Sequence, residues 1–271
     1  MKRLFSLCLI ALASLFGTSA LAQATLGVEP PVTLQDAVPG QTIATNIKIG
    51  NPSDKPVRLR VSLSDWTYNQ MGDLEFLNVG KIPGSAAAWT RLADTVLTVP
   101  GKGAVVARYT ITVPKDATPG SHWGVIFFTS ENAQNDPGTT AAAMSVRVAH
   151  TFYVNIAPTR SSGRITGIFG RPSTEDTNRY LFAINYQNTG NIAQVLSGRV
   201  EIRDSSGRAV AVAPFKQQVV LPGAVRVLQS NLTGPLPAGD YTALVVLNYG
   251  DKNKDIAGEY SFTLKKPLAP S

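Results

Sequence analysis

The side chains that could carry out chemistry in this chain are few and form no recognisable catalytic pattern. The two histidines, His122 and His150, lie in alternating strand-like runs without a His, Cys or acidic partner at metal-ligand spacing. Ser53, Ser64 and Ser121 lack the sequence surroundings of a nucleophile elbow, and a triad assembled from distant loops has no support in the sequence. We therefore predict a protein that is not an enzyme and that binds no metal or cofactor.

Residues 251–255, Asp-Lys-Asn-Lys-Asp, carry carboxylate and amide groups of the kind that bind calcium. A calcium loop also needs a glycine and a distal glutamate at fixed positions, and both are missing here. We interpret this segment as a hairpin turn.

The three tryptophans offer a different chemistry, an aromatic platform for a sugar ring. Trp66 follows an alternating apolar strand and Trp123 begins one, so both are predicted to be core residues. Trp89 follows a short alanine run and is predicted to be the most exposed of the three. A carbohydrate-binding module that uses Trp89 therefore stays open as one hypothesis.

The N-terminus predicts export. Lys2 and Arg3 precede an apolar run at 4–16, and the segment ends in Ala-Leu-Ala at Ala22, as in a cleaved secretory signal. We expect a signal peptide over residues 1–22 and a soluble product in the periplasm, outside the cell or in the cell envelope, which does not span the membrane. Cleavage would also remove Cys8, the one cysteine, so stability must come from core burial.

The charge balance argues against a nucleic-acid partner. The chain has 25 basic and 18 acidic residues, and loss of the two basic residues of the signal leaves a net charge of +5. These charges are scattered, whereas nucleic-acid binders more often cluster Lys and Arg. We expect a solvated surface with some contact to anionic polymers of the cell envelope.

The elements that must position any site are short strands. Alternating runs occur at 57–63, 105–113, 181–186, 198–203, 241–249 and 260–264. Turn signals separate them, including Pro-Gly at 100–101, 119–120 and 222–223, and no long helical period is present. The sequence predicts an all-β fold built of β-sandwiches.

An approximate internal repeat predicts two such domains. Residues 47–57 and 184–191 each read as a strand followed by a turn that begins with asparagine, Asn51 or Asn188. Residues 119–127 and 237–245 each read as a turn that enters a strand through an aromatic residue. We predict two tandem immunoglobulin-like sandwiches, one over residues 23–157 and one over residues 158–271, with the boundary at about Pro158.

One strand is unusually long. Residues 144–156 alternate over thirteen positions, whereas strands usually run about 5–6 residues. One face carries the side chains of Met144, Val146, Val148, His150, Phe152, Val154 and Ile156. The strand is either a closing strand of the first sandwich or an exposed edge that pairs with a strand of another chain.

The first domain contains an ordered series of segments: the strand and Asn-rich turn at 46–51, the strand ending in Asp-Trp at 57–66, the Pro-Gly turn and basic strand at 97–111, the Pro-x-Asp and aromatic strand at 113–126, and the Thr-Phe-Tyr followed by Pro at 151–158. This series resembles the PapD-like periplasmic pilus (fimbrial) chaperones. The resemblance implies donor-strand complementation, in which the long strand lends apolar side chains to an incomplete pilus subunit. It implies that Met144, Val146 and Val148 bind the partner, with His150 and Phe152 further along the same face.

The sequence departs from that family at the residues that anchor a subunit's terminal carboxylate. The family uses an Arg in the first strand and a Lys on the long strand, but residues 26–32 contain no Arg and His150 occupies the Lys position. Arg147 or Arg160 could replace them, or could be solvated surface charges.

A second resemblance is to bacterial cell-surface proteins with tandem immunoglobulin-like domains that bind cell-wall-associated partners. It is carried by the turns at 38–40 and 51–53, the aromatic and Asn-x-x-Gly at 68–73, and Pro-Lys-Asp-Ala-x-x-Gly at 114–120. We hypothesise an exported assembly chaperone that binds extended polypeptide of pilin-like or surface-protein subunits. A non-catalytic adhesion or structural module, with a stable envelope partner or a carbohydrate, is the alternative.

Overall fold

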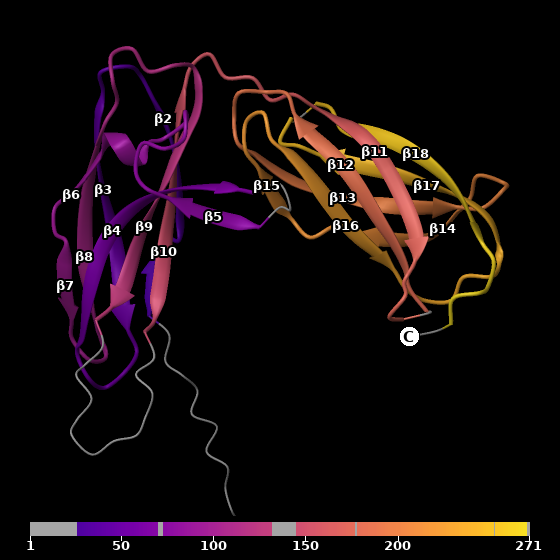
Figure 1. Ribbon diagram of the computed structural model, residues 1–271, viewed down its shortest axis with the longest axis horizontal. Helices are drawn as coiled ribbons and strands as arrows, with labels where there is room; N and C mark the ends of the chain where they lie inside the picture. The colour runs from indigo at the N-terminus through magenta and orange to yellow at the C-terminus, as the bar shows by residue number, and fades with distance from the viewer. Residues whose placement is uncertain (1–25, 70–72, 132–144, 177, 252, 270–271) are drawn as a thin grey trace, which may run out of the picture.

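The computed structural model describes residues 26–69, 73–131, 145–176, 178–251 and 253–269, which form two β-sandwiches set at an angle to one another (Figure 1). The predicted all-β, two-sandwich, immunoglobulin-like fold is confirmed. Apart from strands, these residues form a single turn of 3₁₀-helix, η1 (Ala87–Trp89), and no helix among them is long and apolar enough to cross a membrane. The predicted signal peptide at 1–22 lies outside the described residues.

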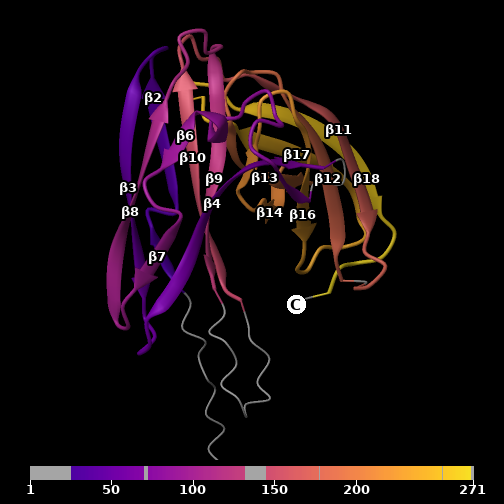
Figure 2. The same cartoon turned by 60° about the vertical axis from the view of Figure 1, so that its left-hand side comes forward.

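The first sandwich is built of two sheets that face each other (Figure 2). Its strands are β1 (Gly27–Glu29), β2 (Val32–Ala37), β3 (Thr42–Asn51), β4 (Val57–Tyr68), β5 (Leu74–Leu77), β6 (Thr90–Leu92), β7 (Val96–Val99), β8 (Gly103–Thr112), β9 (Gly120–Ser130) and β10 (Arg147–Ile156). One sheet has the order β1-β3-β8-β6 and the other β2-β10-β9-β4-β5, with β7 also paired to β4. The apolar faces of both sheets form one core, which includes Ile47, Leu59, Ile126 and Phe128.

The second sandwich repeats this plan. Its strands are β11 (Gly163–Pro172), β12 (Tyr180–Asn188), β13 (Gln194–Arg203), β14 (Ala209–Pro214), β15 (Gln218–Val220), β16 (Val225–Leu232), β17 (Gly239–Asn248) and β18 (Ile256–Leu264). The sheets have the orders β11-β12-β16 and β14-β13-β17-β18, with β15 also paired to β13. The segment 251–255, predicted as a hairpin turn, joins the antiparallel strands β17 and β18. The predicted boundary near Pro158 falls between β10 and β11, and its position stays a prediction.

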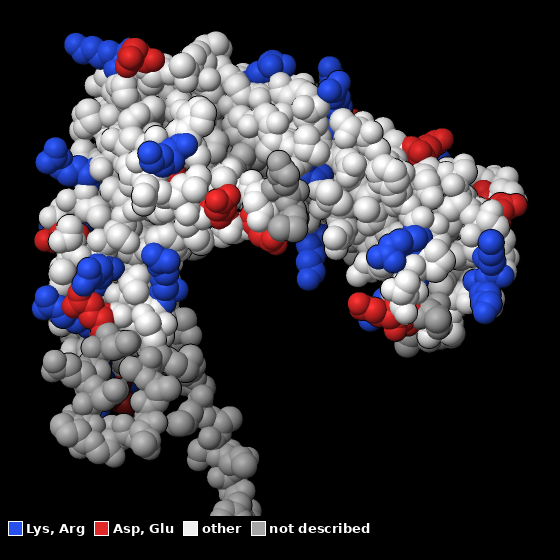
Figure 3. All heavy atoms as spheres, in the orientation of Figure 1, with Lys and Arg blue, Asp and Glu red and all other residues white. Residues whose placement is uncertain are grey.

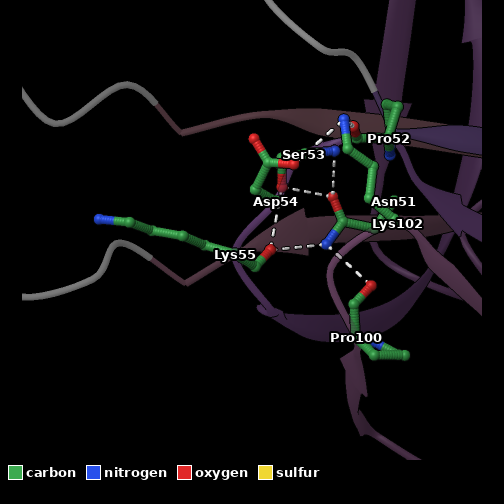
Figure 4. A network of polar contacts seen from close by, with 7 residues as sticks. All are labelled: Asn51, Pro52, Ser53, Asp54, Lys55, Pro100 and Lys102. Carbon is green, nitrogen blue, oxygen red and sulfur yellow. Dashed lines mark hydrogen bonds and ion pairs between the residues drawn. The ribbon is translucent and has the colours of Figure 1, made fainter.

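The internal repeat has a physical basis in two buried asparagines. Asn51 is 3% exposed, and its side-chain amide donates to the carbonyls of Lys55 at 2.8 Å and Pro100 at 3.2 Å (Figure 4). It also donates to the carbonyl of Val99, at 3.3 Å. Asn188 is fully buried and donates in the same way to Ile192 and Val220, at 2.8 and 3.0 Å. In both, the side-chain oxygen accepts the backbone N–H two residues later, at 3.0 and 2.9 Å. Each asparagine thus ties its own turn to a neighbouring strand.

The two sandwiches are joined by an apolar cluster and a set of backbone contacts. Trp66 and Trp123 pack with Tyr153 of the first sandwich and Leu221 of the second. Asn191 of the second sandwich accepts the Ser121 N–H at its carbonyl, at 2.8 Å, and donates from its side chain to the carbonyl of Pro158, at 3.0 Å. Gly120 has φ +124, and a Cβ there would lie 2.4 Å from the Asn191 oxygen. The angle between the domains is therefore set by close packing on both sides of the linker.

We predict that Asn51→Ala and Asn188→Ala each lower the free energy of unfolding by about 1–3 kcal/mol, because the carbonyls of Val99 and Val220 each lose a buried hydrogen bond from a side-chain donor. Chemical denaturation monitored by tryptophan fluorescence measures the loss. Asn46→Ala, at an exposed position of β3, is the matched control and should change stability little. Equal losses in all three variants would contradict the structural role assigned to the buried pair.

Candidate polypeptide-binding edge and cleft

The strand β10 is paired along both sides over only part of its length. It runs antiparallel to β9 from Arg147 to Ile156. On its other side it runs parallel to β2, but only from Thr151 onward. No strand in the described part of the chain pairs with residues 147–150 on that side. The first part of β10 is therefore an open sheet edge.

The backbone hydrogen bonds show which residues present this edge. The N–H of Ser130 on β9 donates to the carbonyl of Val146 at 2.8 Å, whereas the N–H of Thr151 donates to the carbonyl of Pro31, towards β2, at 3.0 Å. Successive residues of an antiparallel strand direct their backbone N–H and C=O groups to opposite sides. Arg147 and Ala149 therefore direct theirs outward, away from β9, as Thr151 does. These are the groups that a further strand would pair with.

The face of β10 that the sequence predicts as partner-binding points into the first sandwich. Val146 and Val148 are partly buried and pack against the edge of the core. Further along, His150 and Phe152 are completely buried. Met144 lies outside the described residues. The roles of all five in binding a partner stay predictions, and only the two valines keep part of their surface accessible.

His150 holds the start of β2 against β10. Its Nδ1 lies 2.8 Å from the carbonyl oxygen of Pro30, which can only accept, so Nδ1 carries the proton and donates. Nε2 then accepts from the hydroxyl of Tyr109, at 3.0 Å, with Thr33 Oγ1 at 3.3 Å. Burial lowers the pKa of His150, and the hydrogen bond to Pro30 opposes that shift in part. The neutral ring therefore fits this site.

The two arginines predicted as substitutes for the carboxylate anchor are not brought together. The Arg147 guanidinium lies 3.9 Å from the centre of the Phe127 ring. Arg160 lies beyond the other end of β10, a strand roughly 30 Å long, and donates from its side chain to the carbonyl of Thr189 at 2.9 Å. Both are exposed, and their predicted contact with a partner stays a prediction.

The opposite face of β10 looks onto a cleft between the two domains, with a volume of about 510 Å³. The first sandwich contributes Val32 and Leu34 of β2, Trp66 and Tyr68 of β4, Leu74 and Phe76 of β5, Val125 of β9, and Ala149, Thr151 and Tyr153 of β10. The second contributes Ala193, Val195, Gln217 and Val219. None of these described lining residues is charged. Figure 1 shows β5 extending from the first sandwich towards the second.

Sequence reasoning missed most of this cleft. Val32 enters the predictions only as part of the segment 26–32, which has no arginine, and Leu34 enters none of them, although both side chains are large and exposed. Their alternation with polar neighbours was a usable signal for a strand with an apolar outer face. The contribution of Val195 had no such signal, because it depends on how the two domains are placed.

The exposure of the three tryptophans follows the prediction. Trp66 and Trp123 are buried, as predicted, although in the cluster between the domains. Trp89 is the most exposed of the three, as predicted, but it is partly buried: its ring packs against the first core and lies 4.3 Å, centre to centre, from the ring of His122. On the face in Figure 3, charged side chains are scattered among large uncharged areas.

Comparison with known proteins identifies the fold. No family model and no curated protein matches the sequence. Among solved structures, a chain from a chaperone–tip adhesin complex of CFA/I fimbriae biogenesis aligns with a TM-score of 0.50 and 10% identity, over 90% of this chain and all of that one. The class 5 fimbriae chaperone CfaA aligns at 0.49, with 12% identity over 88% and 98% of the two chains. A structure of the Salmonella enterica SafA pilin with the SafB chaperone aligns at 0.46, with 12% identity over 88% and 97%.

The alignment with a TM-score of 0.50 covers both sandwiches, in the same order along the chain. The protein therefore has the fold of the PapD-like fimbrial chaperones, as its sequence resemblance implied.

We predict that the protein loses stability as the pH falls from 7 to 5. An unfolded histidine titrates near pH 6.5, whereas burial lowers the pKa of His150 and of His122 in the folded state. Between those values the unfolded chain binds more protons, so acidification favours unfolding. Denaturation at a series of pH values measures the slope. His150→Gln should flatten it, and His122→Gln/His150→Gln should flatten it further; an unchanged slope in the double variant would contradict this assignment.

Proposed function

We propose that this protein is an exported, periplasmic assembly chaperone that binds extended polypeptide of pilin-like or surface-protein subunits. Binding occurs by β-strand addition to residues 147–150, and the protein carries out no catalysis. The observation that supports this proposal is the pairing of β10, which has β9 on one side but β2 on the other only from Thr151 onward. A strand added along residues 147–150 would therefore end where β2 begins to pair with β10, at Thr151.

The side chains along this edge suit a polypeptide partner. Each backbone hydrogen bond between strands contributes only about 0.5–1.5 kcal/mol, and a fully buried Val side chain about 1.5–3 kcal/mol. Val146 and Val148 are half-buried at the end of the sandwich, so a partner that extends the sheet and covers them gains both kinds of contribution. These two contributions support donor-strand complementation as the mode of binding.

The comparisons support the same class of partner. One similar structure contains a chaperone with a tip adhesin, and another a chaperone with a pilin. For the present chain we infer subunits of that kind, secreted and rich in β-structure. Trp89, the residue on which the carbohydrate hypothesis rested, is partly buried, and its ring packs at a tilt against that of His122, so nothing in its placement favours a sugar.

We expect the tagged protein, isolated gently from its native envelope, to bring down small secreted β-rich chains in equimolar amount. Mass spectrometry of the co-purifying chains makes the measurement. Recovery of one stable surface protein that never exchanges, or of wall polymer alone, would favour the adhesion module and contradict a chaperone.

We further predict that Ala149→Pro reduces capture of these chains by about tenfold or more. The outward N–H of Ala149 is lost, and the proline ring occupies the line of the incoming strand. The hydrogen bonds between β10 and β9 are made by the residues on either side of Ala149 and stay intact. The variant should therefore remain folded, as measured by circular dichroism.

Ala149→Ser keeps the backbone donor and is the matched control, with capture close to that of the wild type. If Ala149→Pro is folded and captures as well as Ala149→Ser does, the open edge of β10 is not the binding site.

A further inference from the structure

The cleft between the domains lies where a strand added to β10 would end. Ala149 belongs to the open edge through its backbone and to the cleft through its side chain. Val32 of β2 is in register with Thr151, so a strand laid along residues 147–150 lies in line with β2 and meets it at Pro31. Because side chains alternate along a strand, every second residue near that end is directed towards the cleft.

Both walls of the cleft are apolar. Leu34 of the first sandwich is 65% exposed and Val195 of the second is 49% exposed, and both line it. The rings of Trp66 and Tyr153 meet edge to face at 6.2 Å between their centres. The volume falls within the roughly 300–1,000 Å³ that is usual for ligand-binding clefts. The cleft therefore has room for apolar side chains and an apolar surface for them to pack against.

Charged groups have no matching partner among the described residues that line this cleft. Arg226 lies nearby but is engaged, with its guanidinium 3.8 Å from the centre of the Tyr68 ring. Moving a carboxylate or an ammonium group from water into apolar surroundings without a partner is strongly unfavourable. The two terminal backbone groups of a polypeptide carry such charges, whereas the backbone between them carries none.

We propose that the cleft binds an uncharged, apolar stretch from the interior of the captured polypeptide and disfavours a free chain terminus. The proposal rests on strand addition at β10 and specifies which part of the client lies beside it. The captured chain then continues past the cleft, and recognition depends on apolar side chains rather than on a terminal carboxylate.

The experiment uses an eight-residue peptide of alternating Thr and Val with a fluorophore on a central side chain. It is made in three forms: capped at both ends, with a free carboxylate, and with a free amine. Fluorescence anisotropy with the full chain gives the three dissociation constants. We expect the capped form to bind about tenfold or more tightly than either charged form, equivalent to about 1.4 kcal/mol. Tighter binding of the free carboxylate, or equal binding of all three forms, would overturn the proposal.

Two variants of exposed residues sharpen the test. Leu34→Lys places a cation in the cleft and should reduce the preference for the capped form over the free carboxylate by about tenfold. Val106→Lys, at a 49% exposed position of β8 away from the cleft, should leave that preference unchanged. If the preference is the same in Leu34→Lys and in the wild type, the peptide end does not lie in the cleft and the proposal is wrong.

Ala149→Pro separates this proposal from the proposed function. If strand addition is correct, that variant binds all three peptides more weakly while their order of affinity is kept. If it binds them as well as the wild type does, or if the wild type binds none of them, strand addition at this edge fails and the proposal for the cleft fails with it.

Discussion

The feature on which the rest of this structure depends is the unequal pairing of β10. A single strand of ten residues is shared between the core of the first sandwich, the strand β2 and the open edge. Its second half is held on both sides and is buried, which fixes the direction and register of the whole strand. Its first half is held in the same direction and register, although no described strand pairs with its backbone on the side away from β9. An open edge is useful for recognition only when it is held straight, and here Phe152, Val154 and Ile156 hold it through the core.

The joint between the domains determines what lies beside that edge. The cluster around Trp66 and Trp123 closes one end of the space between the sandwiches, and Leu221 anchors the second sandwich to it. Asn191 then fixes the linker through Ser121 and Pro158, with a glycine at the point of closest approach. Because these contacts are short and act together with the buried apolar cluster, the second sandwich presents Val195 towards β10 in a defined place. The shape of the cleft therefore depends on the joint between the domains as well as on the residues that line it.

The sequence was sufficient for the fold because its signals are local. Alternation predicted the strands, and the pair of turn-forming asparagines revealed two copies of one plan, which Asn51 and Asn188 confirm by equivalent hydrogen bonds. The long strand was also visible, but alternation cannot say which residues have a neighbour on both sides. That depends on where β2 begins to pair, and a cis Glu29–Pro30 bond and the buried ring of His150 lie at that point. The cleft could not be predicted, because its two walls belong to different domains and come together only through the joint between them.

An open edge also needs protection from pairing with itself, and the same residues supply it. Natural sheets limit edge-to-edge association by keeping the edge short and by placing charge on it. The open segment here spans residues 147–150, and Arg147 carries its charge at the outer end, over the ring of Phe127. Two copies paired antiparallel about residue 147 would bring their Arg147 side chains directly opposite each other, where like charges are destabilising. Under the proposed function, a partner strand without a cation at that position would escape this penalty, so the charge that opposes self-association would not oppose binding of the partner.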